Sequence, residues 1–199
     1  MTPQSLQRDD MLISQRAELK PPVSELDHAR GGAHALVTLV EYGDFDCSYC
    51  QQAYPVVRAA ERHFGQRLRF AFRHNPRGDL HEHAMIAAKA AEAAALQGSF
   101  WMMFDRLLRR PGALDERALI AHAVALGLDA ARFAADLHSA GVLARIRQDQ
   151  VSGLRSVVIG TPAFFIDGHH FLGRPDFVTF IQAIDARLNV SRASAAKPA

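Results

Sequence analysis

The chain has 199 residues, of which 49% are hydrophobic and 22% charged, a globular composition that excludes a disordered or fibrous chain. Lysine plus arginine exceeds aspartate plus glutamate by 23 − 21 = +2, which gives no electrostatic argument for nucleic-acid binding. No run of 18 apolar residues is present, so we expect no membrane span. Two cysteines are too few for a disulfide scaffold or an all-cysteine zinc site.

The N-terminal part of the chain predicts a strand, a helix and a second strand. Residues 1–22 are polar and aperiodic, and we expect a flexible arm without an export signal. The β-branched run 36–40 predicts a strand buried on both faces, followed by the turn-rich residues 41–46. Helical spacing over 48–64 and alternation over 68–72 complete a βαβ unit.

The following stretch, residues 77–157, has helical signals and no strand pattern. An alanine-rich helix is predicted over 81–97, and apolar residues at helical spacing predict a buried helix face over 100–108. Asp115 and Asp129 are residue types that cap helix N-termini, so we expect two short helices there and a longer helix after them.

The C-terminal part predicts two strands and a helix. Asp167-Gly168 is a hairpin turn signal between the predicted strands 163–166 and 169–172, and a final helix should begin near Pro175. The expected architecture is α/β, with a βαβ half and a ββα half separated by an all-helical insert. The predicted segments are a flexible arm (1–22), a discontinuous domain (23–76 and 158–190), a helical insert (77–157) and a disordered tail (191–199).

Cys47-Ser48-Tyr49-Cys50 is the motif with the most evident chemistry. It lies where the predicted buried strand gives way to the first helix, and unpaired N–H groups and the dipole at a helix start favour a thiolate. We therefore expect the pKa of Cys47 to lie below about 8.5, and Cys47 to be the exposed, attacking sulfur. Cys50 lies one turn later and nearer the interior, and is expected to resolve the mixed disulfide.

Two other interpretations of the cysteine pair stay open. One is an incidental pair, and the other is half of a zinc site, which needs two more ligands. His81 and His83 are the nearest candidates by type, but they open an alanine-rich helix, where we expect them to be solvated. The strand, turn and helix around the cysteines favour redox chemistry. His74, His169 and His170 have no partner pattern that predicts a ligand or a base.

Glu41, the Cys47–Cys50 motif and the Gly160-Thr161-Pro162 stretch together resemble the DsbA-like branch of the thioredoxin superfamily, over roughly residues 23–190. The resemblance implies a thioredoxin fold, in which a central mixed β-sheet is flanked by helices, with the helical insert that marks the DsbA branch. It also implies thiol–disulfide oxidoreductase activity that needs no cofactor.

The resemblance further implies roles for three residues. Pro162 matches the family's cis-proline, which packs against the reactive disulfide, and the backbone of Thr161 would pair with an extended substrate segment. Glu41 stands where the family has a buried acidic residue, whose role is to take or relay the proton of Cys50.

Ser48 and Tyr49 depart from the Pro-His pair that DsbA has between its cysteines. The histidine there helps to stabilise the thiolate, whereas neither Ser48 nor Tyr49 carries a positive charge. We therefore expect a more reducing protein than DsbA.

These inferences predict an oxidoreductase that exchanges its cysteine pair with cysteines of polypeptide substrates and is reset by a redox partner. An isomerase or reductase that uses the same residues is one alternative, and a non-catalytic metal-binding or interaction module is another. We expect a monomer without a nucleic-acid partner. As the sequence stands, without a signal peptide, the expected location is cytoplasmic; a periplasmic or other extracytoplasmic location is the alternative if a signal was removed.

Overall fold

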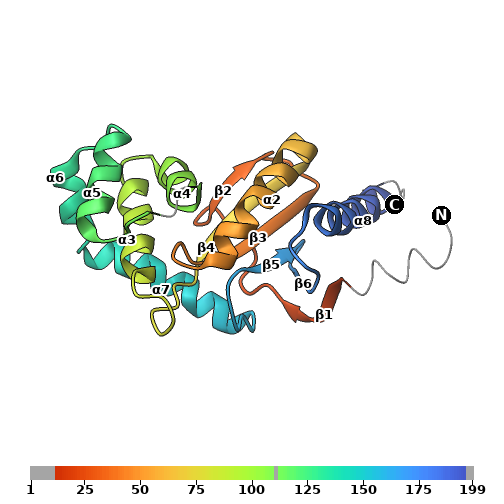
Figure 1. The fold of residues 1–199 in the computed structure, drawn as a ribbon. Coiled ribbons are helices and arrows are strands. Elements are labelled where there is room, and N and C mark those ends of the chain that lie inside the picture. Colours follow the sequence, from red (N-terminus) through yellow and green to blue (C-terminus); the bar gives the residue numbers. More distant parts are fainter. Residues whose placement is uncertain (1–11, 110–111, 196–199) are drawn as a thin grey trace.

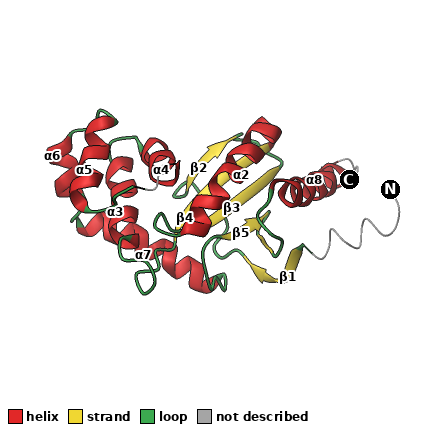
Figure 2. Ribbon diagram, viewed as in Figure 1, coloured by secondary structure: helices red, strands yellow, loops and turns green. Residues whose placement is uncertain are grey.

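The computed structural model describes residues 12–109 and 112–195. A six-stranded mixed sheet, in the order β1-β6-β5-β3-β4-β2, forms the centre of the molecule, with α2 and α8 beside it and α3–α6 gathered beyond one end (Figures 1 and 2). The strands are β1 (Ile13–Glu18), β2 (His28–Gly31), β3 (Val37–Gly43), β4 (Leu68–His74), β5 (Ala163–Ile166) and β6 (His169–Phe171). The helices are α2 (Ser48–Phe64), α3 (Ala84–Ala95), α4 (Phe100–Arg109), α5 (Glu116–Ala125), α6 (Ala130–Asp136), α7 (Ala140–Arg155) and α8 (Phe177–Ala195).

Strand β3 lies in the middle of the sheet and determines where the cysteines come. It pairs in parallel with β4, the two being connected through α2, and antiparallel with β5. The predicted βαβ unit and β5–β6 hairpin are therefore confirmed. Leu39 and Val40 on β3 are fully buried, as expected for a strand covered on both faces.

The expectation of a flexible arm over residues 1–22 is wrong for the part that the structure describes. Residues Ile13–Glu18 form β1, which adds to the sheet edge by antiparallel pairing with β6. A second missed strand, β2, pairs with β4 at the opposite edge. Both are edge strands that backbone hydrogen bonds stabilise, so they need no apolar alternation in their sequences. Residues 1–11 lie outside the described part.

Several element boundaries differ from the predicted ones. Strand β3 continues to Gly43, so the first half of the predicted turn 41–46 is strand. Helix α3 begins at Ala84 rather than at residue 81, and α8 begins at Phe177 and continues to Ala195, into the predicted disordered tail 191–199. Residues 196–199 lie outside the described part.

The insert consists of helices α3–α7, which confirms its all-helical character. Phe100, Met103, Phe104, Leu107 and Leu108 are all buried on one side of α4, as their spacing predicted. The Phe104 ring packs against Phe45 and Phe72, so this face of the insert shares one apolar core with the sheet. Asp115 and Asp129 cap α5 and α6 through their side chains. None of the described helices has the length and apolar character needed to cross a bilayer.

Candidate active site

Both cysteines lie at the start of α2, directly after the carboxyl end of β3. Cys47 is the N-cap residue with extended backbone (φ −82°, ψ 118°), and its carbonyl oxygen accepts the N–H of Gln51 at 3.1 Å. Its own N–H donates to the carbonyl oxygen of Asp44 at 3.2 Å, which fixes the turn that leads out of the sheet. Cys50 lies in the first helical turn, and the structure holds the two as thiols.

The prediction that Cys47 is the exposed sulfur is wrong for this dithiol structure. Cys47 is 2% exposed and Cys50 is fully buried, whereas Tyr49 between them is 68% exposed. The Cys47 thiol points to the turn before β5 and donates to the carbonyl oxygen of Thr161 at 3.4 Å. The Cys47 side chain therefore belongs to the same buried apolar cluster as Cys50, and its sulfur lies against Thr161, a residue that is itself partly exposed.

The Thr161–Pro162 peptide bond is cis, the isomer that the resemblance implies. The bond immediately precedes β5, and β5 pairs with β3, the strand that leads to Cys47. Two segments more than 100 residues apart are thus brought to the same sulfur by the sheet.

The two thiols have opposite acidities. Hydrogen bonds from the Cys50 thiol, from Thr161 and from the N–H groups of Cys50 and Tyr49 lower the pKa of Cys47 to about 5, although desolvation opposes them. Burial, together with the hydrogen bond to Cys47 and the charge of Glu41, holds the pKa of Cys50 well above its usual value. At neutral pH Cys47 is a thiolate and Cys50 a thiol.

Glu41 lies on β3 and is 1% exposed. Burial raises the pKa of its carboxyl to about 8, and the charge of Cys47 adds to this rise, whereas Arg30 opposes it. Within the described part of the chain, Oε1 of Glu41 has no hydrogen-bond partner. The side chain is therefore a buried carboxyl, mostly protonated at neutral pH, whose charge is felt at both sulfurs.

Asp44 and His81 are a part of this site that the sequence did not reveal. The Asp44 carboxylate is fully buried and accepts the N–H groups of Asp46 and Arg77 at 2.9 Å and the Nδ1–H of His81 at 2.7 Å. His81 was expected to be solvated, but it is bonded to this carboxylate because the segment after β4 folds back over the turn before α2. Thirty-seven residues separate the two side chains, so no local pattern could have joined them.

His74 has a hydrogen-bond partner that its sequence pattern did not reveal. Nε2 of His74 and Nε2 of His28 each lie 2.7 Å from the same oxygen of Glu92. Both rings therefore direct Nε2 at one carboxylate oxygen, which accepts a hydrogen bond from each of them. Nδ1 of His74, which a metal-bound ring would use as a donor, is buried without a partner among the described residues. The geometry is that of a hydrogen-bonded triad with the carboxylate oxygen as the shared acceptor.

The same geometry bears on the zinc interpretation of the cysteines. Among the described residues, these three side chains form the one group whose donor atoms converge closely enough for a metal ion, and neither cysteine belongs to it. His81, the candidate third ligand, directs Nδ1 at Asp44.

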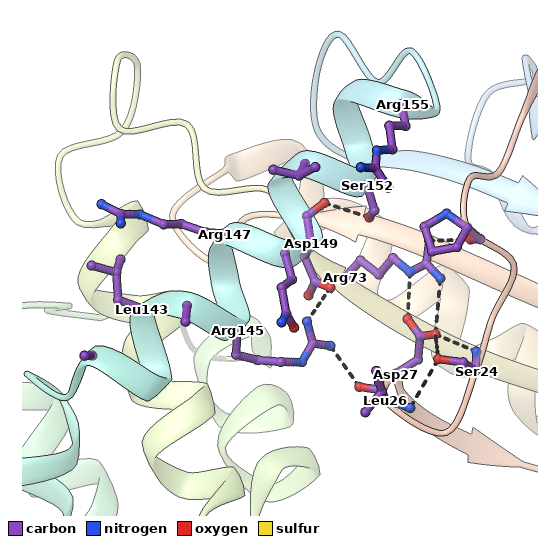
Figure 3. A pocket seen from close by; sticks show the side chains of 15 residues that line it. Ser24, Leu26, Asp27, Arg73, Leu143, Arg145, Arg147, Asp149, Ser152 and Arg155 are labelled. Atoms are coloured by element: carbon purple, nitrogen blue, oxygen red, sulfur yellow. Dashed lines mark hydrogen bonds and ion pairs between the residues drawn. The ribbon is translucent and has the colours of Figure 1, made fainter.

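A pocket of about 660 Å³ lies between residues 21–27 and α7, and neither cysteine lines it (Figure 3). Arg73 reaches from β4 to the carboxylate of Asp27 at 2.6 and 3.1 Å, and Arg145 on α7 bonds to Asp149 and to the carbonyl oxygen of Leu26. These bonds tie the segment before β2 to the sheet and to the insert, so the pocket's ionic groups have a structural role.

Comparison with known proteins gives a consistent family. A family model described as thioredoxin matches residues 24–186. Curated relatives are named Na(+)/H(+) antiporter NhaA: that of Herminiimonas arsenicoxydans is 44% identical over 169 residues, covering 84% of this chain and 27% of that protein. NhaA 1 of Salinispora arenicola is 45% identical over 156 residues, covering 77% of this chain and 24% of that protein. The chain thus spans about a quarter of the length of these relatives.

Solved structures with the same fold include a thioredoxin-like oxidoreductase from Silicibacter pomeroyi DSS-3, at 26% identity and a TM-score of 0.74, covering 87% of this chain and 95% of that one. BdbD from Bacillus subtilis, in its oxidised form, has 18% identity and a TM-score of 0.76, covering 87% and 98%. The thiol-disulfide exchange protein alpha-DsbA2 from Wolbachia pipientis has 18% identity and a TM-score of 0.73, covering 82% and 88%. The last two are likenesses of fold.

Proposed function

This chain belongs to the thioredoxin family and has its DsbA-like fold, and from that premise we propose that it is a thiol–disulfide oxidoreductase acting on cysteines of other polypeptides. One observation carries the proposal: the pKa of Cys47 is lowered to about 5 while that of Cys50, one turn further, is raised. A pair of this kind has one sulfur that attacks or leaves as a thiolate and one that keeps its proton until it is needed.

In the reducing direction, the Cys47 thiolate attacks one sulfur of a substrate disulfide, and the other sulfur leaves as a thiolate. Cys50 then loses its proton and attacks Cys47, which releases the second substrate sulfur and leaves a Cys47–Cys50 disulfide. In the oxidising direction the same steps run backwards, and two electrons pass to the cysteine pair. A redox partner then resets the pair, and no bound cofactor is required.

Glu41 is proposed as the group that exchanges a proton with Cys50. Its carboxyl is buried, its pKa of about 8 is close to neutral pH, and its charge is coupled to that of Cys50. A general base works best when its pKa lies near the working pH, and Glu41 meets this condition.

Thr161 and Pro162 are proposed as the substrate-binding turn. The Thr161 carbonyl oxygen lies 3.4 Å from the Cys47 sulfur, so an extended peptide paired with this backbone would bring its own sulfur to Cys47. Tyr49, two residues after Cys47, is largely exposed and is proposed to offer an aromatic surface to the same peptide. Ser48 is the first helical residue and belongs to the motif without an assigned chemical step.

Two cysteine variants test the proposal. Cys47→Ser should abolish thiol-dependent reduction of insulin, because the attacking sulfur is lost, whereas Cys50→Ser should accumulate mixed disulfides that Cys50 can no longer resolve. Turnover is measured by insulin precipitation, and the mixed disulfides by non-reducing gels and mass spectrometry.

Ser48→Ala, which leaves both sulfurs in place, is the matched control and should keep turnover within about 2-fold. Wild-type turnover in Cys47→Ser would contradict the assignment. Stoichiometric zinc held by both cysteines, without insulin reduction, would favour the non-catalytic module instead. The rate at which the protein oxidises reduced ribonuclease is then compared with the rate at which it repairs scrambled ribonuclease. The first rate measures oxidase activity and the second measures isomerase activity.

The antiporter name describes proteins about four times longer than the matched segment, and ion transport is not part of this proposal. The direction of electron flow depends on the reduction potential of the Cys47–Cys50 pair relative to the redox potential of its compartment. A redox titration of the pair is therefore the next measurement.

A further inference from the structure

We propose that His81 is a positioning residue for the exchange reaction: bonded to the buried Asp44, its imidazolium supplies the positive charge beside the Cys47 thiolate that the Ser48–Tyr49 pair lacks. The inference rests on the proposed function and assigns to that same site a residue outside the cysteine motif.

Asp44 connects His81 to the Cys50 sulfur and to the backbone of Cys47. Its backbone N–H donates to the Cys50 sulfur at 3.4 Å, and its carbonyl oxygen accepts the N–H of Cys47 at 3.2 Å. Its carboxylate accepts the Nδ1–H of His81 at 2.7 Å. A change in the charge of His81 therefore acts directly on Asp44, the residue whose backbone N–H and carbonyl oxygen hold the two cysteines in place.

The carboxylate of Asp44 also explains why His81 carries a proton. A fully buried carboxylate is costly unless a cation compensates it, and two of its three hydrogen bonds come from neutral backbone N–H groups. His81 is the third donor, and its ring is the only donating group of the three that can itself become positive; the Arg77 guanidinium is paired with Asp79 and acts on Asp44 through its charge alone. Without that charge, the field of Asp44 would act against the Cys47 thiolate.

The charged surroundings of His81 favour the imidazolium. The hydrogen bond to Asp44 raises the pKa of His81 above its usual 6.5, and the charges of Asp44, Cys47 and Asp46 add to the rise, although desolvation opposes it. Because Cys47 titrates at about 5, thiolate and imidazolium coexist from there to above pH 6.5. The titratable and charged groups around His81 are Asp44 and Asp46 before α2, Cys47 at its start, and Arg77, Asp79 and His83 on the segment that carries His81.

The test measures the pKa of Cys47 in the reduced, full-length protein, from thiolate absorbance at 240 nm and from the pH dependence of iodoacetamide alkylation. In His81→Asn the side-chain amide can still donate to Asp44 but carries no charge. We expect this variant to raise the Cys47 pKa by about 0.5–1 unit, which slows alkylation about 2- to 5-fold at pH 5 and leaves it unchanged at pH 8. In His81→Lys a cation is restored, so the pKa should return toward the wild-type value.

His83→Asn is the matched control, because His83 lies two residues away, is more exposed and stands 3.9 Å from Asp46. It should shift the Cys47 pKa by less than about 0.2 units. A His81→Asn pKa equal to wild type, or an equal shift in His83→Asn, would overturn the inference. Circular dichroism establishes that each variant is folded. If His81→Asn shifts the Cys47 pKa and His81→Lys does not restore it, the role of His81 is structural and the inference is overturned.

The two proposals fail in different ways. If wild-type Cys47 titrates as an ordinary thiol and does not reduce insulin, the proposed function is lost. If wild-type Cys47 is acidic and active and the His81 variants behave like wild type, only the role of His81 is lost.

Discussion

Cys47 and Cys50 share a helical turn, yet their sulfurs differ in acidity because each faces different neighbours. The Cys47 sulfur accepts a hydrogen bond from the Cys50 thiol and, because it lies at the helix start, further ones from the N–H groups of Cys50 and Tyr49. Cys50 is fully buried and close to the charge of Glu41. In a mixed disulfide with a substrate, Cys47 is therefore the better leaving group, and Cys50 needs a proton acceptor before it can attack Cys47.

Replacing Glu41 by Gln tests this need for an acceptor. Gln has nearly the same shape but cannot take a proton, so release of substrate from the Cys47 mixed disulfide should slow by about 10-fold or more. Alkylation of Cys47 should stay within about 2-fold of wild type, because the first sulfur does not depend on Glu41 for its proton. Stopped-flow measurement of the second step, beside the alkylation rate, checks the separation; equal slowing of both steps would argue against the relay.

Glu41→Gln should slow the reaction and yet make the folded protein more stable. The pKa of Glu41 is about 8 when folded and 4.5 by its ordinary value, so the wild-type protein loses stability as the pH rises from 4.5 to 8. Glu41→Gln lacks this loss and should be more stable by about 3 kcal/mol at pH 7, with no difference at pH 4. A variant that is slower and more stable would show that Glu41 acts in the chemical step, because the loss of a packing contact would make the protein less stable.

At the scale of elements, the triad of His28, His74 and Glu92 joins β2, β4 and α3, and so anchors the insert to the sheet. His28 also stacks on Phe100 of α4, with ring centroids 3.5 Å apart. Burial alone would raise the pKa of Glu92, but the hydrogen bonds from His28 and His74 outweigh it and hold this pKa well below its usual range. The ionised carboxylate therefore stabilises the folded state above the ordinary Glu pKa, and this contribution is lost as the pH falls below it.

Glu92→Gln removes the charge and keeps an oxygen that both rings can bond. We expect a loss of about 1–3 kcal/mol in unfolding free energy at pH 7, and a gap from wild type that shrinks as the pH falls to about 3.5. Glu116→Gln is the matched control: Glu116 meets His138 at 3.1 Å on the surface, where such pairs contribute about 0–1 kcal/mol. Urea unfolding at both pH values measures the gap; equal effects of the two variants would show that the triad does not anchor the insert.

The helices and strands that could be predicted from sequence are those whose pattern lies within their own residues or in the turn that joins them. Residues 48–64 have an apolar stripe along one helix face, and α2 spans that range. The Asp167-Gly168 turn likewise predicted the β5–β6 hairpin. Strands β1 and β2 were missed because their pairing depends on β6 and β4, which are distant in the chain.

The same distinction applies to the site. The direction of the Cys47 pKa shift was predictable, because the two-residue spacing places the Cys50 thiol within hydrogen-bond reach of Cys47 and because the N–H groups at a helix start also lower the pKa of a thiol. Its low exposure was not, since the covering contact comes from Thr161, 114 residues away. The pairing of His81 with Asp44 likewise exists only once the segment after β4 has folded over the turn before α2.

At the scale of the whole molecule, the acidity of Cys47 links redox state to stability. In the reduced protein the Cys47 pKa is about 5 when folded, against an ordinary value of 9.0. The unfolded chain therefore binds more protons between these values, so the stability of the reduced form rises with pH there and is lost as the pH falls through 5. The oxidised form has no Cys47 thiol and lacks this slope, whereas Glu41 is present in both forms.

We expect the difference in unfolding free energy, reduced minus oxidised, to rise from pH 5 to pH 9 by up to about 1.4 kcal/mol per pH unit, and by less where solvent screens the thiolate. The Cys47–Cys50 loop is short, so its disulfide adds about 2 kcal/mol to the oxidised form, a constant that leaves the slope unchanged. Urea unfolding of both forms at pH 5, 7 and 8 gives the slope, and reduced Cys47→Ser should lose it. Between pH 5 and pH 9 a fold that holds Cys47 as a thiolate must gain stability as the pH rises, because the unfolded chain still binds the proton there. A difference that is independent of pH would therefore mean that the fold does not stabilise the Cys47 thiolate.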